Sequence, residues 1–358
     1  MKRWTVIGLH EGFTSRLLAL LIREYSCCYL QVRRRFDLSH GILAPLYEKH
    51  LPEQGESTSG DNMSFNSFSL SVSRFQMKSF ILACVTASLS LSATAACPDD
   101  AAIDAYVVEY STLKLSKGFG NDISLADAEC AKRKLGKKLT LPLGALVGYK
   151  AAFTNPALQQ RFGVDGPKWG YMYERNMIDI IAVLPANFGA RPLVEADFLV
   201  EVSDPLLADA KTPLEALGYL ESIIPFIELP DLMLEGQFSG NAMIATNVAF
   251  RGGVMGMEIP VKKTQAFVDA LANMTVVMTD DAEGKELGRV KGSVLMDNPI
   301  NAAMWLAQAL KKDGITLKKG DILSLGGFIP PLPTKPGMKA RVQYIGLPGD
   351  PQLTVEFN

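Results

Sequence analysis

Two acidic residues lie two positions apart in a segment whose composition predicts a β-strand. The segment is VEADFLV at residues 194–200, and side chains alternate between the two faces of a strand, so Glu195 and Asp197 point to the same side. Neighbouring carboxylates on an apolar strand repel each other and lose hydration, so they require a cation or a proton. A third acid, Glu228, lies in a similar apolar setting, FIELP at 226–230. The pattern favours an all-carboxylate site for Mg²⁺ or Mn²⁺, and a strand edge with solvated acids is the alternative.

Lys150 is the candidate acid or base. It interrupts the apolar segment 144–153, where burial depresses the pKa of a lysine and nearby acids raise it again. Two interpretations stay open: a group that transfers protons, and a structural lysine that pairs with one of the acids. The three histidines lie at positions 10, 40 and 50, so the rest of the chain offers no Ser-His-Asp, Cys-His or histidine-zinc site.

The elements that must position these residues are those of a mixed α+β domain. The 358 residues, 48% of them hydrophobic and 21% charged, are typical of a globular protein, and a net charge of −2 gives no electrostatic reason to expect nucleic acid as a partner. Periodicity predicts helices at 99–114, 124–136 and 298–312 and strands at 322–325, 339–345 and 353–357. Gly136 is expected to end the second helix, residues 167–173 to form a loop, and residues 252–256 to form a turn.

The first 95 residues differ from the rest. Residues 1–76 show no sustained periodicity and are predicted to be an upstream extension, either a mis-called start or disordered. Met77-Lys78, an uncharged run at 81–91 and Ala93-Thr94-Ala95 predict a secretory signal peptide at 77–95. Residues 96–358 would then be the catalytic domain, periplasmic or secreted, with no membrane span in the mature chain. A tail followed by a buried helix is the alternative.

Cys97 and Cys130 are the cysteines of the mature chain, and export favours a disulfide between them. If a turn near 118–121 folded the two helices into an antiparallel hairpin, Cys130 would stop short of Cys97. A crossed arrangement or a kinked loop is therefore required. A lipid anchor at Cys97 and a pair of free thiols are the alternatives.

Several short motifs resemble the 2-keto-4-pentenoate hydratase and 4-oxalocrotonate decarboxylase group of the fumarylacetoacetate hydrolase superfamily. In chain order they are GYK at 148–150, EAD at 195–197, IE at 227–228, the segment 247–256, NP at 298–299 and SLG at 324–326. The resemblance runs from about residue 99 to the C-terminus. It implies a mixed β-roll of the fumarylacetoacetate hydrolase C-terminal type with flanking helices, and a homo-oligomer.

The resemblance also implies roles for individual residues. Glu195, Asp197 and Glu228 fall on the metal ligands, with Asp197 in place of the second glutamate of the family. Lys150 falls on the family lysine. Substrate contacts are implied for Thr154 and for Asn247, the residue that survives from the family's Asp-Asn-Ala-Ser segment.

The function implied is that of a divalent-metal-dependent hydratase-type lyase, a hydro-lyase of aromatic catabolism. Its substrate would be a small 2-oxo or 2-hydroxydienoate acid that reacts through a metal-stabilised enolate while Lys150 shuttles a proton. A decarboxylase or a C–C hydrolase of the same superfamily is one alternative. A non-catalytic binding protein of the same fold is another, because the Asp and Ser of the family segment are lost and an export signal is present.

Overall fold

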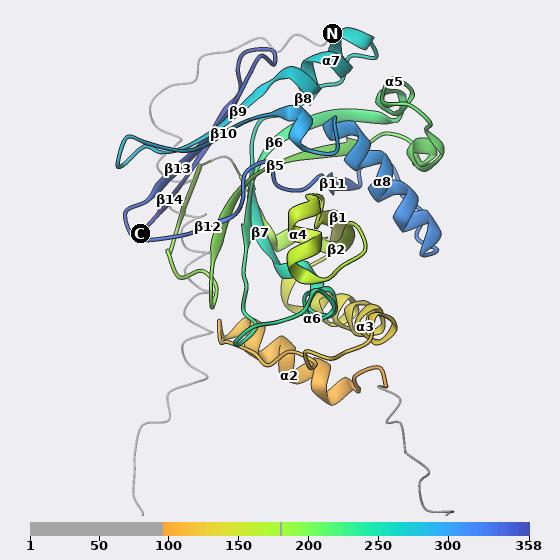
Figure 1. The fold of residues 1–358 in the computed structure, drawn as a ribbon, viewed down its shortest axis with the longest axis vertical. Coiled ribbons are helices and arrows are strands. Elements are labelled where there is room, and N and C mark those ends of the chain that lie inside the picture. Colours follow the sequence, from red (N-terminus) through yellow and green to blue (C-terminus); the bar gives the residue numbers. More distant parts are fainter. Residues whose placement is uncertain (1–95, 180) are drawn as a thin grey trace, which may run out of the picture. The chain divides into compact units, whose positions relative to one another are not determined.

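The computed structural model describes residues 96–179 and 181–358, which belong to one compact unit (Figure 1). The predicted upstream extension at 1–76 and the predicted signal peptide at 77–95 lie outside the described residues. Within the described ranges, no helix is long and apolar enough to cross a membrane.

The larger of two sheets carries the candidate site. It has nine strands, in the order β2-β1-β11-β5-β6-β7-β3, with β12 pairing with β5 and β8 with β6. Its strands are β1 (Leu146–Ala152), β2 (Lys168–Tyr173), β3 (Met177–Ile178), β5 (Leu193–Val202), β6 (Leu220–Pro230), β7 (Phe250–Met255), β8 (Ile259–Pro260), β11 (Ile322–Ser324) and β12 (Leu332–Pro333).

The smaller sheet has five strands in the order β10-β9-β13-β14-β4. Its strands are β4 (Ile181–Leu184), β9 (Thr275–Asp280), β10 (Lys285–Lys291), β13 (Lys339–Ile345) and β14 (Gln352–Phe357). The strands predicted near the C-terminus are confirmed. In Figure 1 this sheet and helix α8 lie on different sides of β5 and β6.

The helices begin at side-chain caps that the sequence makes recognisable. They are α2 (Asp100–Ser111), α3 (Leu125–Leu143), α4 (Pro156–Phe162), α5 (Pro213–Ala216), α6 (Gly240–Ala245), α7 (Gln265–Asn273) and α8 (Pro299–Lys312). Ser124 caps α3 by accepting a hydrogen bond from the backbone N–H of Asp127. The predicted end of this helix at Gly136 is wrong. A Cβ at Gly136 would lie 2.5 Å from the ring of Tyr171, so the glycine provides room for packing inside the helix.

Strand β5 separates the hydrophobic core from the acidic face of the sheet. Ala196, Phe198 and Val200 are fully buried in the main core. In this core the ring of Phe198 stacks on Tyr344 of β13 with the centroids 4.4 Å apart. Glu195 and Asp197 lie on the opposite face of the strand, as the alternation predicts. The mixed α+β class is therefore confirmed, and the core holds the acidic strand against the second sheet.

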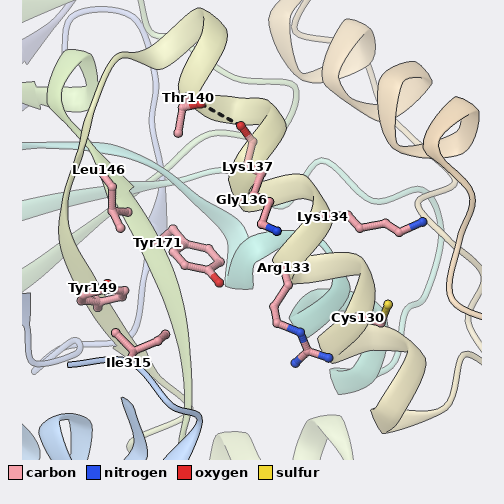
Figure 2. Close-up of a pocket in the computed structure, with 10 residues that line it drawn as sticks. All are labelled: Cys130, Arg133, Lys134, Gly136, Lys137, Thr140, Leu146, Tyr149, Tyr171 and Ile315. Carbon is pink, nitrogen blue, oxygen red and sulfur yellow. Dashed lines mark hydrogen bonds between the residues drawn. The ribbon is translucent and has the colours of Figure 1, made fainter. Parts of the chain in front are cut away.

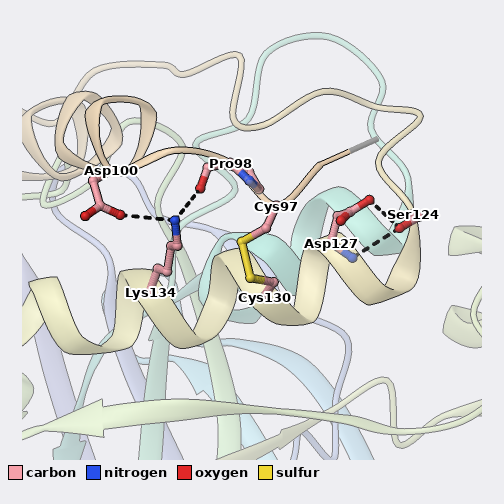
Figure 3. The surroundings of a disulfide bond; sticks show 7 residues. All are labelled: Cys97, Pro98, Asp100, Ser124, Asp127, Cys130 and Lys134. Carbon is pink, nitrogen blue, oxygen red and sulfur yellow. Dashed lines mark hydrogen bonds and ion pairs between the residues drawn. A yellow bond between two sulfur atoms is a disulfide. The ribbon is translucent and has the colours of Figure 1, made fainter. Parts of the chain in front are cut away.

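The predicted disulfide is confirmed, because Cys97 and Cys130 are bonded and their Cα atoms lie 5.7 Å apart (Figure 3). The helices that follow and carry these cysteines do not form an antiparallel hairpin. Lys134 pairs with Asp100 and Lys138 with Asp104, so the two helices run side by side in the same direction. Residues 112–124 lead the chain back from the end of α2 to the level of its start, so the start of α2 lies beside the first half of α3.

Two segments that lack a conspicuous strand pattern are strands. Residues 167–173 were expected to form a loop, yet Lys168–Tyr173 form β2 and pair with β1. Residues 252–256 were expected to form a turn, yet Phe250–Met255 form β7 between β6 and β3. Both predictions are wrong. In both segments glycines interrupt the alternation of side chains that would indicate a strand.

Candidate active site

The three candidate ligands and the candidate lysine share one face of the large sheet. Glu195 and Glu228 are direct partners in the β5–β6 ladder, and Asp197 lies two residues along the same strand. Lys150 is paired with Ser324 of β11, which is in turn paired with Leu199 of β5. Paired residues point to the same side of a sheet. The register therefore brings these side chains to one surface although Lys150 and Glu228 lie 78 positions apart in the chain.

Lys150 and Glu228 form a buried ion pair. Their exposed fractions are 5% and 1%, and the lysine Nζ donates to Glu228 Oε1. Nζ also lies 3.5 Å from the carbonyl oxygen of Val248. Burial acts to lower the pKa of Lys150, but the charges of Glu228 and Glu195 outweigh this effect and leave the pKa raised. The structure thus contains the ion pair that a structural role of Lys150 would require. The same pairing keeps the lysine side chain cationic.

Asp197 is fully buried and accepts a hydrogen bond of 2.6 Å from Ser324 Oγ. Burial and the neighbouring charge of Glu228 raise the pKa of Asp197 to about 8, although the hydrogen bond from Ser324 acts in the opposite direction. The pKa of Glu195 is likewise raised, first by burial and then by the charge of Glu228. These carboxylates therefore hold protons more readily than solvated acids do, and a cation would relieve the same repulsion.

Glu195 occupies space that Gly327 leaves free. A Cβ at Gly327 would lie 1.5 Å from Glu195 Oε1, so this carboxylate lies directly against the backbone of the glycine. The loop that follows β11 is fixed along β5, because the backbone N–H groups of Leu325 and Phe328 donate to the carbonyls of Phe198 and Ala196. The two glycines between these bonds let the chain pass close to the acids.

The donor set suits a hard divalent cation, but the carboxylates do not converge on one point. Each lies in a different setting: Glu228 pairs with Lys150, Asp197 accepts a hydrogen bond from Ser324, and Glu195 lies against the backbone of Gly327. Within the described residues, no three His, Cys, Asp or Glu side chains are grouped closely enough to hold a metal ion as they stand. Three ionised carboxylates and one ammonium carry a net charge of −2, and all the donors are oxygens, which Mg²⁺ and Mn²⁺ prefer. The predicted common face is confirmed, and coordination by all three acids requires their side chains to rotate.

Thr154 and Asn247 occupy different environments. Thr154 lies against the loop after β11, where a Cβ at Gly326 would be 2.7 Å from its Oγ1. Asn247 is buried, and its side-chain amide binds the backbone of Tyr171 twice: Oδ1 accepts from the N–H at 2.7 Å and Nδ2 donates to the carbonyl at 3.0 Å. Both polar ends of Asn247 therefore hold edge strand β2, and a substrate contact for this residue stays a prediction.

The turn that contains Asn247 is strained beside the lysine. Asn247, Val248 and Ala249 have φ values of 63°, 47° and 62°, and a β-branched residue such as Val248 rarely adopts this left-handed conformation. The turn directs the Val248 carbonyl toward Lys150 Nζ. It also approaches β2 closely, because a Cβ at Gly170 would lie 2.6 Å from the Val248 side chain. The strain is therefore located where the backbone contacts the candidate lysine.

Two residues near the acids were not predicted as site residues. Ser324 donates a hydrogen bond to Asp197, although the sequence analysis considered this serine only as part of the SLG motif at 324–326. The hydroxyl of Tyr344 reaches from the second sheet to the carbonyl oxygens of Asp197 at 2.5 Å and Phe226 at 3.1 Å. The sequence pattern that could have indicated Ser324 is a serine at the end of a hydrophobic strand, two residues before a pair of glycines. No local pattern marks Tyr344, because its contact depends on how the two sheets pack.

Comparisons with known proteins identify relatives of this chain and a solved structure with a similar fold. No family model matches the chain. It is 27% identical to the 2-keto-4-pentenoate hydratase of Paraburkholderia phymatum over 241 residues, which are 67% of this chain and 81% of the relative. It is 24% identical to the 4-oxalocrotonate decarboxylase of Pseudomonas sp. strain CF600 over 227 residues, 63% of this chain and 84% of the relative. The 4-oxalocrotonate decarboxylase of Pseudomonas putida G7, solved with magnesium and adipate, superposes with a TM-score of 0.63 at 20% identity and covers 72% of this chain and 96% of its own.

The chain thus shares the fold of this solved decarboxylase, and the predicted mixed β-roll with flanking helices is confirmed. The expected resemblance to the hydratase and decarboxylase group is also confirmed, because the curated relatives carry both names. Among these relatives the hydratases are hydro-lyases, which agrees with the expectation of a hydratase-like enzyme.

Proposed function

We propose that this protein is a divalent-metal-dependent lyase that acts on a small 2-oxo or 2-hydroxydienoate acid, in the manner of 2-keto-4-pentenoate hydratase. The observation that carries the proposal is the sheet face on which the buried Lys150–Glu228 pair lies with buried Asp197 and half-buried Glu195. Two buried carboxylates beside a third that is partly buried are costly unless a cation compensates them. The named relatives and the magnesium complex of the decarboxylase from P. putida G7 support the same assignment.

Glu195, Asp197 and Glu228 would hold the cation, which when bound supplies electrophilic stabilisation of negative charge on the oxygens of a 2-oxo acid. Lys150 Nζ carries a proton at neutral pH because the acids around it keep its pKa raised. From Nζ a proton can be delivered to a substrate carbon and later recovered, as general acid–base catalysis requires. Ser324 holds one oxygen of Asp197 in place. The buried cluster of Leu199, Ile224 and Phe226 on the same face excludes water from around the acids.

A binding protein of the same fold is the second candidate function. It is favoured by the Lys150–Glu228 ion pair and by Asn247, whose amide is already used by the backbone of Tyr171. A decarboxylase or C–C hydrolase would use the same cation and lysine, so the class of substrate is better supported than the bond that breaks.

The proposal is tested with Glu228→Gln and a matched control, Glu201→Gln. Glu201 lies on the same strand and face as Asp197 but is partly exposed and contacts Ser222. Calorimetry with Mg²⁺ and 2-oxopentanoate measures binding, and the ultraviolet absorbance of 2-hydroxypenta-2,4-dienoate measures turnover. We expect Glu228→Gln to lose both and Glu201→Gln to keep both. Full activity of Glu228→Gln would refute the proposal, and wild-type binding without turnover of any dienoate would favour the binding protein.

Export and assembly are further proposals. We propose that the mature chain acts in the periplasm or outside the cell, and the Cys97–Cys130 disulfide supports this because such bonds persist in oxidising compartments. Mass spectrometry of the native protein should report an N-terminus close to residue 96. A mature chain that retains residues before Met77 would contradict the proposed signal peptide. The homo-oligomer stays a prediction, which sedimentation analysis of the native protein would test.

A further inference from the structure

A cavity lies on the other side of the sheet from the acids. It has a volume of about 460 Å³ and lies between helix α3 and strands β1 and β2 (Figure 2). Its lining residues are Cys130, Arg133, Lys134, Gly136, Lys137, Thr140, Leu146, Tyr149, Tyr171 and Ile315. Tyr149 precedes Lys150 on β1, so the two side chains leave opposite faces of the strand. A ligand in this cavity would therefore be separated from the candidate active site by the sheet.

The charges that line the cavity have one sign. Arg133, Lys134 and Lys137 contribute cations, and none of the lining residues is an aspartate or a glutamate. Lys134 is already used, because its Nζ binds Asp100 at 3.1 Å and the carbonyl of Pro98 at 2.9 Å. Figure 2 shows Lys134 extended away from Tyr149 and Tyr171, whereas Arg133 leaves the helix on the side nearer to these two tyrosines. Within the described chain, neither Arg133 nor Lys137 has a carboxylate within ion-pair distance.

The floor of the cavity combines apolar surface with hydroxyl donors. Tyr149 and Tyr171 are paired across β1 and β2, and their ring centroids lie 6.0 Å apart. Tyr149 is only 6% exposed, yet its hydroxyl makes no hydrogen bond to any described residue. Burial raises the pKa of both tyrosines to about 12, so both hydroxyls keep their protons as donors. Leu146 and Ile315 complete an apolar wall beside the rings.

We infer that this cavity binds a small aromatic carboxylate. Its volume lies in the usual range for small-molecule sites, about 300–1,000 Å³. A carboxylate accepts hydrogen bonds from a guanidinium and a phenol together, and such charge-assisted bonds are the stronger kind. The apolar wall suits a ring of the ligand and offers nothing to a second charged group. The inference is independent of the proposed function, because it uses none of the residues on the acidic face.

Benzoate is the probe, because it has no 2-oxo group with which to chelate a cation at the acidic face. Calorimetry on the full chain in excess EDTA should give saturable binding with one site per chain. Arg133→Ala should weaken binding about tenfold or more, since it removes one charge-assisted hydrogen bond. Lys138→Ala is the matched control, a cation on the same helix that is bound to Asp104 and does not line the cavity, and should change the affinity less than about twofold. Arg133 is exposed, so its replacement leaves the packing of α3 intact.

Tyr149→Phe provides a second variant, which keeps the ring and removes the donor, and should also weaken benzoate binding. Wild-type protein that shows no saturable benzoate binding would overturn the inference. So would equal losses in Arg133→Ala and Lys138→Ala, because a general surface charge effect would explain them. Sedimentation experiments compare the wild type with Arg133→Ala. If the wild type is an oligomer, Arg133→Ala is a monomer and benzoate does not bind, the cavity belongs to an interface between copies and the inference is wrong.

Discussion

Glu195 and Glu228 face each other directly across the β5–β6 ladder, so their carboxylates leave the same side of the sheet on adjacent strands. Neighbouring strands are separated by about 4.8 Å, which is close enough for strong repulsion between two ionised groups in a buried setting. Lys150 removes part of this repulsion by pairing with Glu228. The relationship explains why the candidate site depends on the balance of charge on this face.

The ion pair between Lys150 and Glu228 is predicted to stabilise the folded protein whether or not the protein is catalytically active. Lys150→Met leaves Glu228 buried with no counter-charge, which should cost about 3–5 kcal/mol in free energy of unfolding. Lys150→Met/Glu228→Gln should recover most of that loss, because no uncompensated charge remains. Urea unfolding in EDTA measures both variants. A single variant that loses less than about 1 kcal/mol would show that the pair is no stronger than a surface salt bridge.

The pKa of Asp197 predicts how the affinity for Mg²⁺ depends on pH. Its folded value of about 8 is raised above the ordinary value of about 3.9, so the folded state holds this proton more tightly than the unfolded state. The stability that this group contributes is therefore full below about pH 4 and is lost as the pH rises toward 8. A cation must displace the proton, so affinity for Mg²⁺ should increase with pH and level off above about pH 8.

Calorimetric titration with Mg²⁺ at pH 5.5, 7.0 and 8.5 measures this dependence. Asp197→Asn should bind Mg²⁺ more weakly and with a smaller dependence on pH, and Glu201→Gln should behave as the wild type. The pKa of Glu195 is also raised, so some dependence on pH should survive in Asp197→Asn. An affinity of the wild type that does not change across this range would contradict the prediction.

The acidic strand could be predicted from sequence because its pattern is local. Ala196 and Phe198 alternate with Glu195 and Asp197, and period two is a property of any strand. The caps of the helices are local as well, as at Ser124. The partner of Glu228 could not be selected in this way. Its pairing with Lys150 arises from the strand order β1-β11-β5-β6, which brings together parts of the chain that are far apart in sequence.

Glycines explain the largest errors of the sequence prediction. The glycine-rich segment at 252–256 was expected to form a turn and the aromatic-rich segment at 167–173 a loop, yet both form strands. Their glycines are required by packing, because a Cβ at Gly170 would lie 2.6 Å from Val248 and one at Gly253 would lie 2.0 Å from the Phe226 ring. Gly136 was taken as a helix end and instead makes room for Tyr171. A glycine required by close packing has the same appearance in sequence as one required by a turn. Only the tertiary contacts distinguish these cases.

Asn247 is predicted to act mainly on the edge strand. Asn247→Ala removes both hydrogen bonds to Tyr171 and places alanine at a φ of 63°, so we expect a loss of about 2–4 kcal/mol in stability. Asn247→Asp keeps the acceptor for the Tyr171 N–H but loses the donor, and should cost less. Urea unfolding measures stability, and KM in the dienoate assay reports substrate binding. An increased KM in Asn247→Ala with unchanged stability would instead support the substrate contact implied by the family resemblance.

The disulfide is predicted to stabilise the first two helices against separation. It links Cys97, just before α2, to Cys130 within α3, and closes a loop with a sequence separation of 33. By the chain-entropy estimate this loop contributes about 3–4 kcal/mol. Cys97→Ser/Cys130→Ser should lose about that much free energy of unfolding relative to the oxidised wild type, and reduced wild type should match the double variant. Both comparisons are made by urea unfolding. The acidic face uses neither cysteine, so Mg²⁺ affinity should not change while the variant is folded. A Cys130 that can be alkylated in unreduced, natively purified protein would contradict the bond.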